Sequence, residues 1–221
     1  MIYGVDEQGG KVRANRGGLA WCPTCGERLI PKCGRIVTHH WAHPGEDCDP
    51  WREQETEWHR YWKGLVRAEC AEITIEKNGQ KHRADIVTRK GMVIELQHST
   101  LGVEKIEQRE TFYGRMIWLF DVAACRPQPK YHPQYYGGRV PVNEAAIRLC
   151  LRPNEKGYHT FRWYHPRKSL AHTTAETYLD VGRNEIFRLM KMGTNTPCGG
   201  WGYLKPAQAF VEWLQKACSA G

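Results

Sequence analysis

Two closely spaced pairs of metal-binding side chains stand near the N-terminus of the 221-residue chain. Cys22 and Cys25 are separated by two residues beside Pro and Gly, and His43 and Cys48 follow in a second segment of the same kind. Thiolates and imidazoles arranged as two pairs are typical of closed, tetrahedral structural zinc sites. The spacing therefore predicts a structural Zn²⁺ ion bound by these four residues, in preference to free cysteines beside incidental histidines.

The histidine ligand of this ion has two candidates. A strand over residues 36–43 would place His40 and His43 on opposite faces, because side chains alternate along a strand. We expect His43 to bind the ion, with His40 as its substitute, and Cys33 to lie outside the ligand set. A segment of this size has little core of its own, so the ion is expected to hold it folded.

Two acidic residues, Asp85 and Glu95, lie in apolar segments farther along the chain. The Asn78-Gly79 pair is a strong hairpin signal, and it predicts a meander of three strands over residues 73–77, 81–89 and 92–98. Glu95 and Gln97 then share one face of the third strand, and Asp85 can lie beside them on the middle strand. Adjacent buried carboxylates are unfavourable unless a cation joins them, and Mg²⁺ or Mn²⁺ would do so while activating water.

Helices are expected on both sides of this meander. The first runs from Asp49, which can cap it, to about Glu69. On it Glu55, His59 and Lys63 are spaced four residues apart and form a polar stripe, a pattern also typical of a solvated face with favourable charge pairs.

The second helix covers residues 102–112 and is followed by a strand over 115–121. Arg109 on this helix and Tyr113 just after it are four residues apart, so they could face the same site.

This order of elements and residues resembles the PD-(D/E)XK nuclease superfamily and, within it, the competence protein CoiA family. The matching segments are Cys22-Pro23-Thr24-Cys25, His40-Trp41-Ala42-His43, Cys48, Glu55-Thr56-Glu57-Trp58-His59, Arg83-Ala84-Asp85 and Glu95-Leu96-Gln97-His98-Ser99. Arg109, Tyr113 and residues 117–119 fall where the family has its Arg, its Tyr and its last core strand. The resemblance covers residues 1 to about 122.

The resemblance implies an α/β (α+β) fold with a restriction-endonuclease-like αβββαβ core, a zinc-binding segment before it and a basic extension after it. Asp85 and Glu95 would bind the catalytic Mg²⁺ or Mn²⁺, together with the backbone carbonyl of Leu96. Glu55 would add a carboxylate, and His59 would bind the metal or orient the scissile phosphate.

Gln97 stands where the superfamily has a catalytic Lys. Its neutral amide can orient water or a phosphate oxygen, but it cannot offset developing charge as an ammonium does. Lys63 is expected to supply the missing positive charge. Lys63, Arg83, Arg109 and Tyr113 are expected to contact the substrate.

The formal net charge of +8 arises almost entirely from residues 122–221, which contain 14 bases and 6 acids together with many aromatic residues. Cations bind phosphates and rings stack on bases, so this composition favours a nucleic-acid surface over a solvated basic face on an aromatic core. Strands are expected over residues 160–164 and 177–181, and helices over 183–192 and 206–217. Residues 126–138 are expected to form a linker or long loop.

These observations divide the chain into a zinc-finger-like segment (1–48), a nuclease-like core (49–122) and a basic extension that grips DNA (123–221). No apolar run long enough for a membrane span and no secretory signal is visible, so a cytoplasmic location is expected. The expected activity is that of a metal-dependent deoxyribonuclease that hydrolyses phosphodiester bonds of single- or double-stranded DNA. The resemblance further implies that recombination machinery is its partner and that incoming or foreign DNA is its substrate. The alternative is an inactive DNA-binding recombination accessory.

Overall fold

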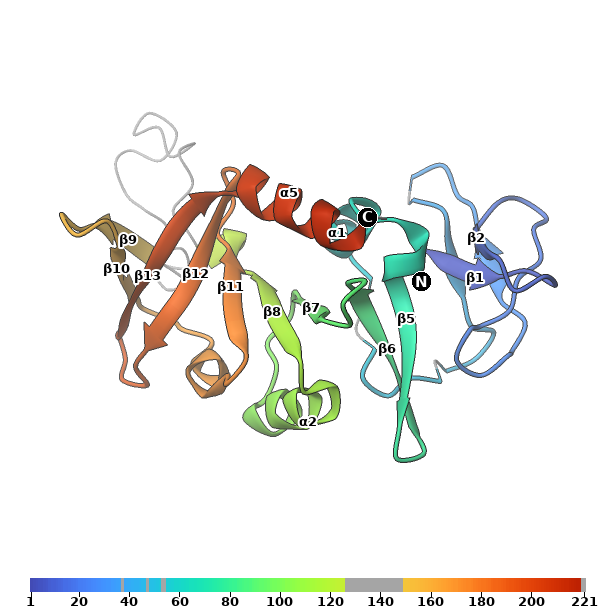
Figure 1. The fold of residues 1–221 in the computed structure, drawn as a ribbon, viewed down its shortest axis with the longest axis horizontal. Helices are drawn as coiled ribbons and strands as arrows, with labels where there is room; N and C mark the ends of the chain where they lie inside the picture. The colour runs from blue at the N-terminus through green and yellow to red at the C-terminus, as the bar shows by residue number, and fades with distance from the viewer. Residues whose placement is uncertain (37, 47, 53–54, 126–148, 220–221) are drawn as a thin grey trace. The chain divides into compact units, whose positions relative to one another are not determined.

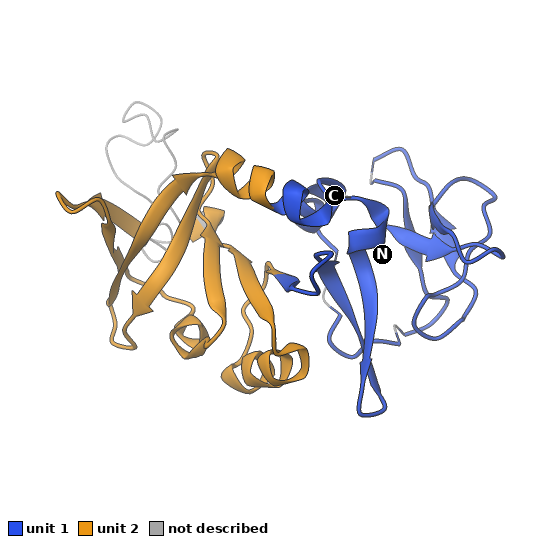
Figure 2. Ribbon diagram, in the orientation of Figure 1, with its two compact units in different colours: residues 1–95, 214–221 blue, residues 96–213 orange. Residues whose placement is uncertain are grey.

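The computed structural model describes residues 1–221 except 37, 47, 53–54, 126–148 and 220–221 (Figure 1). It is a mixed α+β structure whose contacts define two compact units, residues 1–95 with 214–221 and residues 96–213 (Figure 2). The division between the units falls inside strand β7 (Val93–Gln97). The expected linker over residues 126–138 lies outside the described residues.

The first unit begins with two short antiparallel strand pairs, β1 (Tyr3–Val5) with β2 (Lys11–Arg13) and β3 (Ile30–Lys32) with β4 (His40–Ala42). They enclose a small core around Trp41, which is 1% exposed and whose indole N–H donates to the Val12 carbonyl at 2.9 Å. The strand expected over residues 36–43 is shorter in the structure, where only His40–Ala42 form β4. Ile36, at the start of the expected strand, is 97% exposed.

The predicted meander is confirmed as the antiparallel strands β5 (Ala71–Lys77), β6 (Gln80–Val87) and β7. Asn78 and Gly79 both have positive φ, as a two-residue hairpin turn of this kind requires. The turn pairs Lys77 with Gln80 and so fixes the register along the whole hairpin.

The first helix, α1 (Glu57–Gly64), starts later than expected. Asp49 does not cap it, because the Asp49 carboxylate accepts hydrogen bonds from the backbone N–H groups of Trp51 (2.9 Å) and Arg83 (2.7 Å) and pairs with His82 (3.0 Å). Thr56 caps the helix instead, in a reciprocal capping box with His59. A contact with β6 that is distant in sequence thus removes the expected cap. The turn η1 (Ala68–Cys70) links α1 to β5.

The second unit contains a mixed sheet with the strand order β8-β11-β12-β13-β10-β9, in which only the β8–β11 pair is parallel. The strands are β8 (Met116–Asp121), β9 (Leu149–Pro153), β10 (His159–Trp163), β11 (Glu176–Asp180), β12 (Glu185–Met192) and β13 (Cys198–Pro206). The helices are α2 (Val103–Tyr113), η2 (Ala123–Cys125), η3 (Lys168–His172) and α5 (Ala207–Cys218), the last of which ends in the first unit.

The helices expected over residues 102–112 and 206–217 and the strands over 115–121, 160–164 and 177–181 are confirmed. The helix expected over residues 183–192 is wrong, because this segment is β12. Arg183 and Asn184 have positive φ and form a turn that folds β12 back onto β11, and β13 pairs with its other edge. Pairing on both edges overrides a local pattern that suited a helix.

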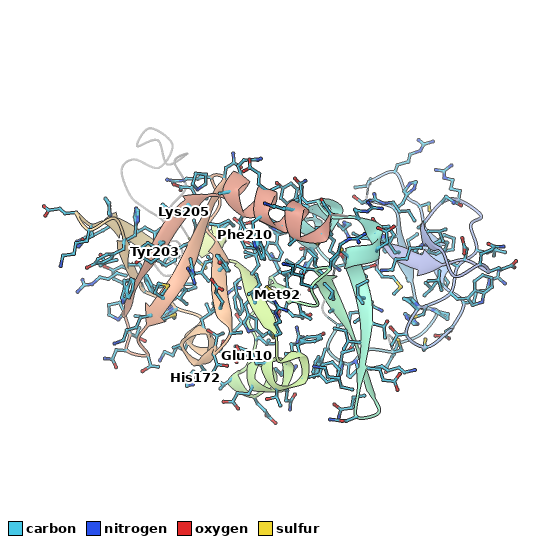
Figure 3. The ribbon with its side chains drawn as sticks, in the orientation of Figure 1. Met92, Glu110, His172, Tyr203, Lys205 and Phe210 are labelled. Atoms are coloured by element: carbon cyan, nitrogen blue, oxygen red, sulfur yellow. The ribbon has the colours of Figure 1, made fainter. Side chains whose placement is uncertain are left out.

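Glu110 on α2 fixes the loop that leads into β11 (Figure 3). Its carboxylate accepts hydrogen bonds from the Trp118 indole (2.9 Å), the Thr174 backbone (3.0 Å) and hydroxyl (2.5 Å), and the Ala175 backbone (3.1 Å). A buried carboxylate with this many donors is well compensated for its lost hydration.

Candidate functional site

The four residues predicted to bind zinc come together in the first unit. One ligand atom from each of Cys22, Cys25, His43 and Cys48 lies within 4.8 Å of all the others. The Cys22 and Cys48 sulfurs are 3.7 Å apart, and Cys48 Sγ is 3.8 Å from His43 Nε2. Zn–S bonds of about 2.3 Å at tetrahedral angles separate two sulfurs by about 3.8 Å, so the donor set fits zinc in both chemistry and size.

The orientation of His43 decides between the two histidine candidates. Its Nδ1 lies 3.0 Å from Glu27 Oε2, which leaves Nε2 directed at Cys48. Carboxylates commonly orient metal-bound histidines in this way. His40 Nδ1 instead lies 2.9 Å from the Thr38 carbonyl, and His40 and Cys33 stand outside the cluster. The Cys₃His cluster could therefore bind a metal such as zinc.

Cys22 lies in a tight turn that stabilises its thiolate. The Thr24 backbone N–H donates to its sulfur at 3.3 Å, and the Gly26 N–H donates to its carbonyl at 2.9 Å. Burial by itself raises the pKa of Cys22, but the backbone N–H groups of Cys25 and Thr24 lower it overall.

A second charged cluster in this unit is centred on the side chain of Lys63. Its Nζ lies 3.0 Å from Glu55 Oε2, 3.1 Å from Glu72 Oε1 and 3.0 Å from Asp85 Oδ1. Lys63 is 4% exposed and Glu72 is 1% exposed, so both charges are removed from water. Lys63 thus supplies a cation from within the chain to Glu55, Glu72 and Asp85.

The strand register places three carboxylates in one row across the meander. Ala71 pairs with Ile86 and Ile73 with Ala84, so Glu72 on β5 lies opposite Asp85 on β6. The β6–β7 ladder ends at the pair of Ile86 and Ile94, and Asp85 and Glu95 are the next residues beyond that pair in the same register. Directly opposed residues project from the same face of a sheet, and like charges in this position are unfavourable without a cation. We call Glu72, Asp85 and Glu95 the carboxylate row.

Glu72 is the member of this row that sequence reasoning missed. Its φ of 54° lies in the left-handed region, which is unusual for a residue with a long side chain. Its carboxylate accepts hydrogen bonds from the backbone N–H groups of Ile2 (2.8 and 2.9 Å) and Tyr3 (2.9 Å). The signal that could have found it is the Asn78-Gly79 turn, because counting outward from that turn pairs residue 72 with residue 85.

The two buried charges of this cluster stabilise each other's ionised form. Burial alone would lower the pKa of Lys63, but Asp85, Glu72 and Glu55 raise it above its ordinary range. Burial alone would raise the pKa of Glu72, but Lys63, the chain's α-amine and Arg83 lower it overall. Lys63 therefore stays an ammonium and Glu72 a carboxylate across the neutral range.

His59 is buried at the start of α1, and its Nδ1 accepts a hydrogen bond from the Thr56 backbone N–H at 3.3 Å. The Thr56 hydroxyl also lies 2.7 Å from this nitrogen and can either donate or accept. Because a backbone N–H can only donate, the contact with the Thr56 N–H favours the tautomer that carries its proton on Nε2. In this tautomer the Nε2–H of His59 can donate a hydrogen bond to a phosphate oxygen.

The remaining predicted site residues are placed as follows. Glu95 is 4% exposed, and Arg83 lies on β6 two residues before Asp85. In the second unit Gln97 is fully buried, and its amide nitrogen donates to the Ser99 carbonyl at 3.0 Å. Arg109 Nη1 donates to Gln97 Oε1 at 3.4 Å, so Arg109 contacts the amide oxygen of Gln97. Leu96 and Tyr113 are also buried.

In the described part of the chain, no three carboxylates converge as closely as the Cys₃His ligands do. The oxygens of Glu55, Glu72 and Asp85 surround Lys63 instead. Glu55 Oε1 is buried and accepts no hydrogen bond from any described residue, so this oxygen can serve another cation.

No protein-family model, curated protein sequence or solved structure matches the chain. Among the described residues, none of the helices has the length and apolar character needed to span a bilayer.

Proposed function

We propose that the chain is a metal-dependent nuclease that hydrolyses phosphodiester bonds in DNA. The observation that carries this proposal is the carboxylate row, in which Asp85 and Glu95 are the next residues in register beyond the paired Ile86 and Ile94 on neighbouring strands. The Lys63 ammonium lies 3.0 Å from Asp85. Paired carboxylates beside a fixed ammonium are the groups that phosphoryl chemistry requires, because they hold a hard cation and offset developing negative charge.

In this proposal Asp85 and Glu95, with the Leu96 carbonyl, hold Mg²⁺ or Mn²⁺, and Glu55 Oε1 adds a further oxygen. The ion would lower the pKa of a bound water so that it can attack phosphorus. Lys63 supplies a positive charge beside Asp85, and its raised pKa keeps it protonated at neutral pH. His59 donates from Nε2 to a phosphate oxygen.

We also propose that the metal of the Cys₃His cluster is a structural zinc ion. All four positions are filled by protein ligands, which leaves none for water or substrate, as in structural sites.

The proposed nuclease would act on incoming or foreign DNA in the cytoplasm, together with recombination proteins.

Cleavage of linear and circular, single- and double-stranded DNA tests the activity. Zinc-loaded protein is expected to cleave with Mg²⁺ or Mn²⁺ and to leave DNA intact without added metal. Asp85→Asn and Glu95→Gln should each reduce the rate more than about 100-fold, since mutating partners one shell farther from a metal already costs 10–100-fold.

Glu76→Gln is the matched control for these variants, because Glu76 is an exposed carboxylate on β5 that pairs with Lys81 at 3.5 Å. It should cleave at the wild-type rate. Cleavage that survives both Asp85→Asn and Glu95→Gln would show that the carboxylate row is not the catalytic site.

A DNA-binding accessory without turnover is the second candidate, and one observation favours it. Lys63 already neutralises Asp85 at 3.0 Å, so a divalent ion must compete with an ammonium that is part of the chain. If the protein binds DNA but leaves it intact under every metal condition, the result would support the DNA-binding accessory and exclude the nuclease.

A further inference from the structure

The sheet of the second unit has one face that packs into the core. Phe161 on β10 and Phe187 on β12 are buried, and their rings meet edge-to-face with centroids 5.8 Å apart. A Cβ atom on Gly200 would come within 2.5 Å of the Phe161 ring, and one on Gly202 within 2.7 Å of the Phe187 ring. Gly200 and Gly202 therefore face this core and leave room for the two rings.

The alternate residues of β13 project from the opposite face. Trp201 and Tyr203 lie there with ring centroids 5.9 Å apart, and the ring of Tyr158, just before β10, lies 5.4 Å from Trp201. All three are only half-buried. Figure 3 shows Tyr203 on β13 and Phe210 on α5; Phe210 contacts Tyr178 of β11 with centroids 5.0 Å apart, so α5 packs over β11. The three rings therefore form an accessible row on the β10–β13 part of this face.

Cations surround these rings. The register places Lys191 of β12 opposite Trp201, and Arg162 of β10 opposite Gly199, two residues from Trp201 on β13. Arg152 of β9 lies opposite Thr160, which itself lies opposite Trp201. All three cationic side chains are exposed. We call Tyr158, Trp201, Tyr203, Arg152, Arg162 and Lys191 the aromatic–basic face.

We infer that the aromatic–basic face binds single-stranded nucleic acid. Rings that are open on one side stack with unpaired bases, and cations spaced around them neutralise the phosphates of the connecting backbone. A duplex offers its phosphates but not its base faces, which are already stacked, so rings on a sheet distinguish the single strand. The inference rests on the proposed function only in taking the bound strand to be DNA. It specifies that the substrate of the proposed nuclease is single-stranded.

The test is binding of a fluorescent oligothymidine of about 20 nucleotides, longer than the 4–16 nucleotides that a comparable single-strand site covers. Zinc-loaded full-length protein is titrated without Mg²⁺ or Mn²⁺, so that no cleavage occurs. Trp201→Ala/Tyr203→Ala should weaken binding at least about 20-fold, because each stacked base contributes appreciably. Trp201→Phe/Tyr203→Phe, which keeps aromatic rings, should retain most of the affinity. Trp213→Ala removes a ring that is 40% exposed on α5 and should bind as the wild type does.

The cations are tested by the salt dependence of the same binding. Arg152→Ala/Arg162→Ala/Lys191→Ala should reduce the slope of log K against log salt by about 2, since each phosphate contact contributes about 0.7. Lys81→Ala/Lys105→Ala/Lys216→Ala removes the same charge from exposed positions elsewhere and should leave the slope unchanged.

The inference is overturned if the ring and cation variants bind as the controls do, or if unlabelled duplex competes as well as the single strand. Failure of the proposed function looks different. Asp85→Asn/Glu95→Gln protein should still bind the oligonucleotide, and a wild-type protein that binds it through Trp201 but never cleaves would refute the nuclease and leave this face standing.

Discussion

A Lys63→Met variant is expected to lose about 3–5 kcal/mol of unfolding free energy, the usual effect of removing one partner from a buried ion pair. Glu72 is 1% exposed and would keep its charge without the ammonium 3.1 Å away. The hydrogen bonds from Ile2 and Tyr3 would remain, but they do not neutralise the charge. Urea denaturation of the zinc-loaded protein measures the loss.

The control and the double variant separate this effect from a simple loss of packing. Lys81→Met breaks the exposed pair with Glu76 and should change stability by less than about 1 kcal/mol. Lys63→Met/Glu72→Gln removes the two most buried charges, although Glu55 and Asp85 still lose the ammonium. The double variant should therefore lose less stability than the two single variants together. A double variant as unstable as the sum of the two single variants would contradict a direct charge coupling.

The pH dependence of this pair follows from the directions of the two pKa shifts. Glu72 titrates below its ordinary value of 4.5 in the folded protein, so its stabilisation is complete above pH 4.5 and is lost as the pH falls toward the folded pKa. Lys63 titrates above its ordinary 10.5, so its contribution is present below pH 10.5 and is lost only above it. The stability difference between wild type and Glu72→Gln should therefore stay constant from about pH 5 to 10 and shrink below that window.

Removal of the metal from the Cys₃His cluster is expected to unfold the N-terminal segment. Structural zinc sites contribute about 10–16 kcal/mol of apparent binding free energy, which is comparable with the whole stability of a domain. The purified protein should carry one zinc ion per chain, and a chelator should expose Trp41 together with the backbone N–H that it donates to the Met1 carbonyl. Metal analysis and amide hydrogen exchange measure the two effects.

Cysteine variants give the matched comparison for this expectation. Cys48→Ser should lose the zinc, whereas Cys33→Ser should retain it, because Cys33 packs against the same core from outside the cluster. Equal zinc content in these two variants would refute the assigned ligand set.

The parts of the structure that short-range spacing controls could be predicted from sequence. The Cys-x-x-Cys turn and the Asn78-Gly79 hairpin are local, and both formed as expected. Glu55 and Lys63, which stand eight residues apart at the two ends of the predicted polar stripe, also make a contact, although Glu55 precedes α1.

The parts that distant contacts control could not be predicted. Asp49 looked like a helix cap, but β6, which lies more than thirty residues away, takes its carboxylate. The local sequence pattern of residues 183–192 predicted a helix, but in the structure these residues pair with β11 and β13 as a strand. The burial of Lys63 depends on Glu72, whose left-handed backbone and hydrogen bonds to residues 2 and 3 leave no local trace in the sequence.

Direct binding of Mn²⁺ tests the carboxylate row most closely, because the nuclease reading requires a divalent ion there in spite of Lys63. Calorimetric titration of zinc-loaded protein is predicted to show one Mn²⁺ site per chain that disappears in Asp85→Asn and persists in Glu76→Gln. A wild-type protein that binds no Mn²⁺, or an Asp85→Asn protein that binds it equally well, would contradict a divalent metal site at the carboxylate row.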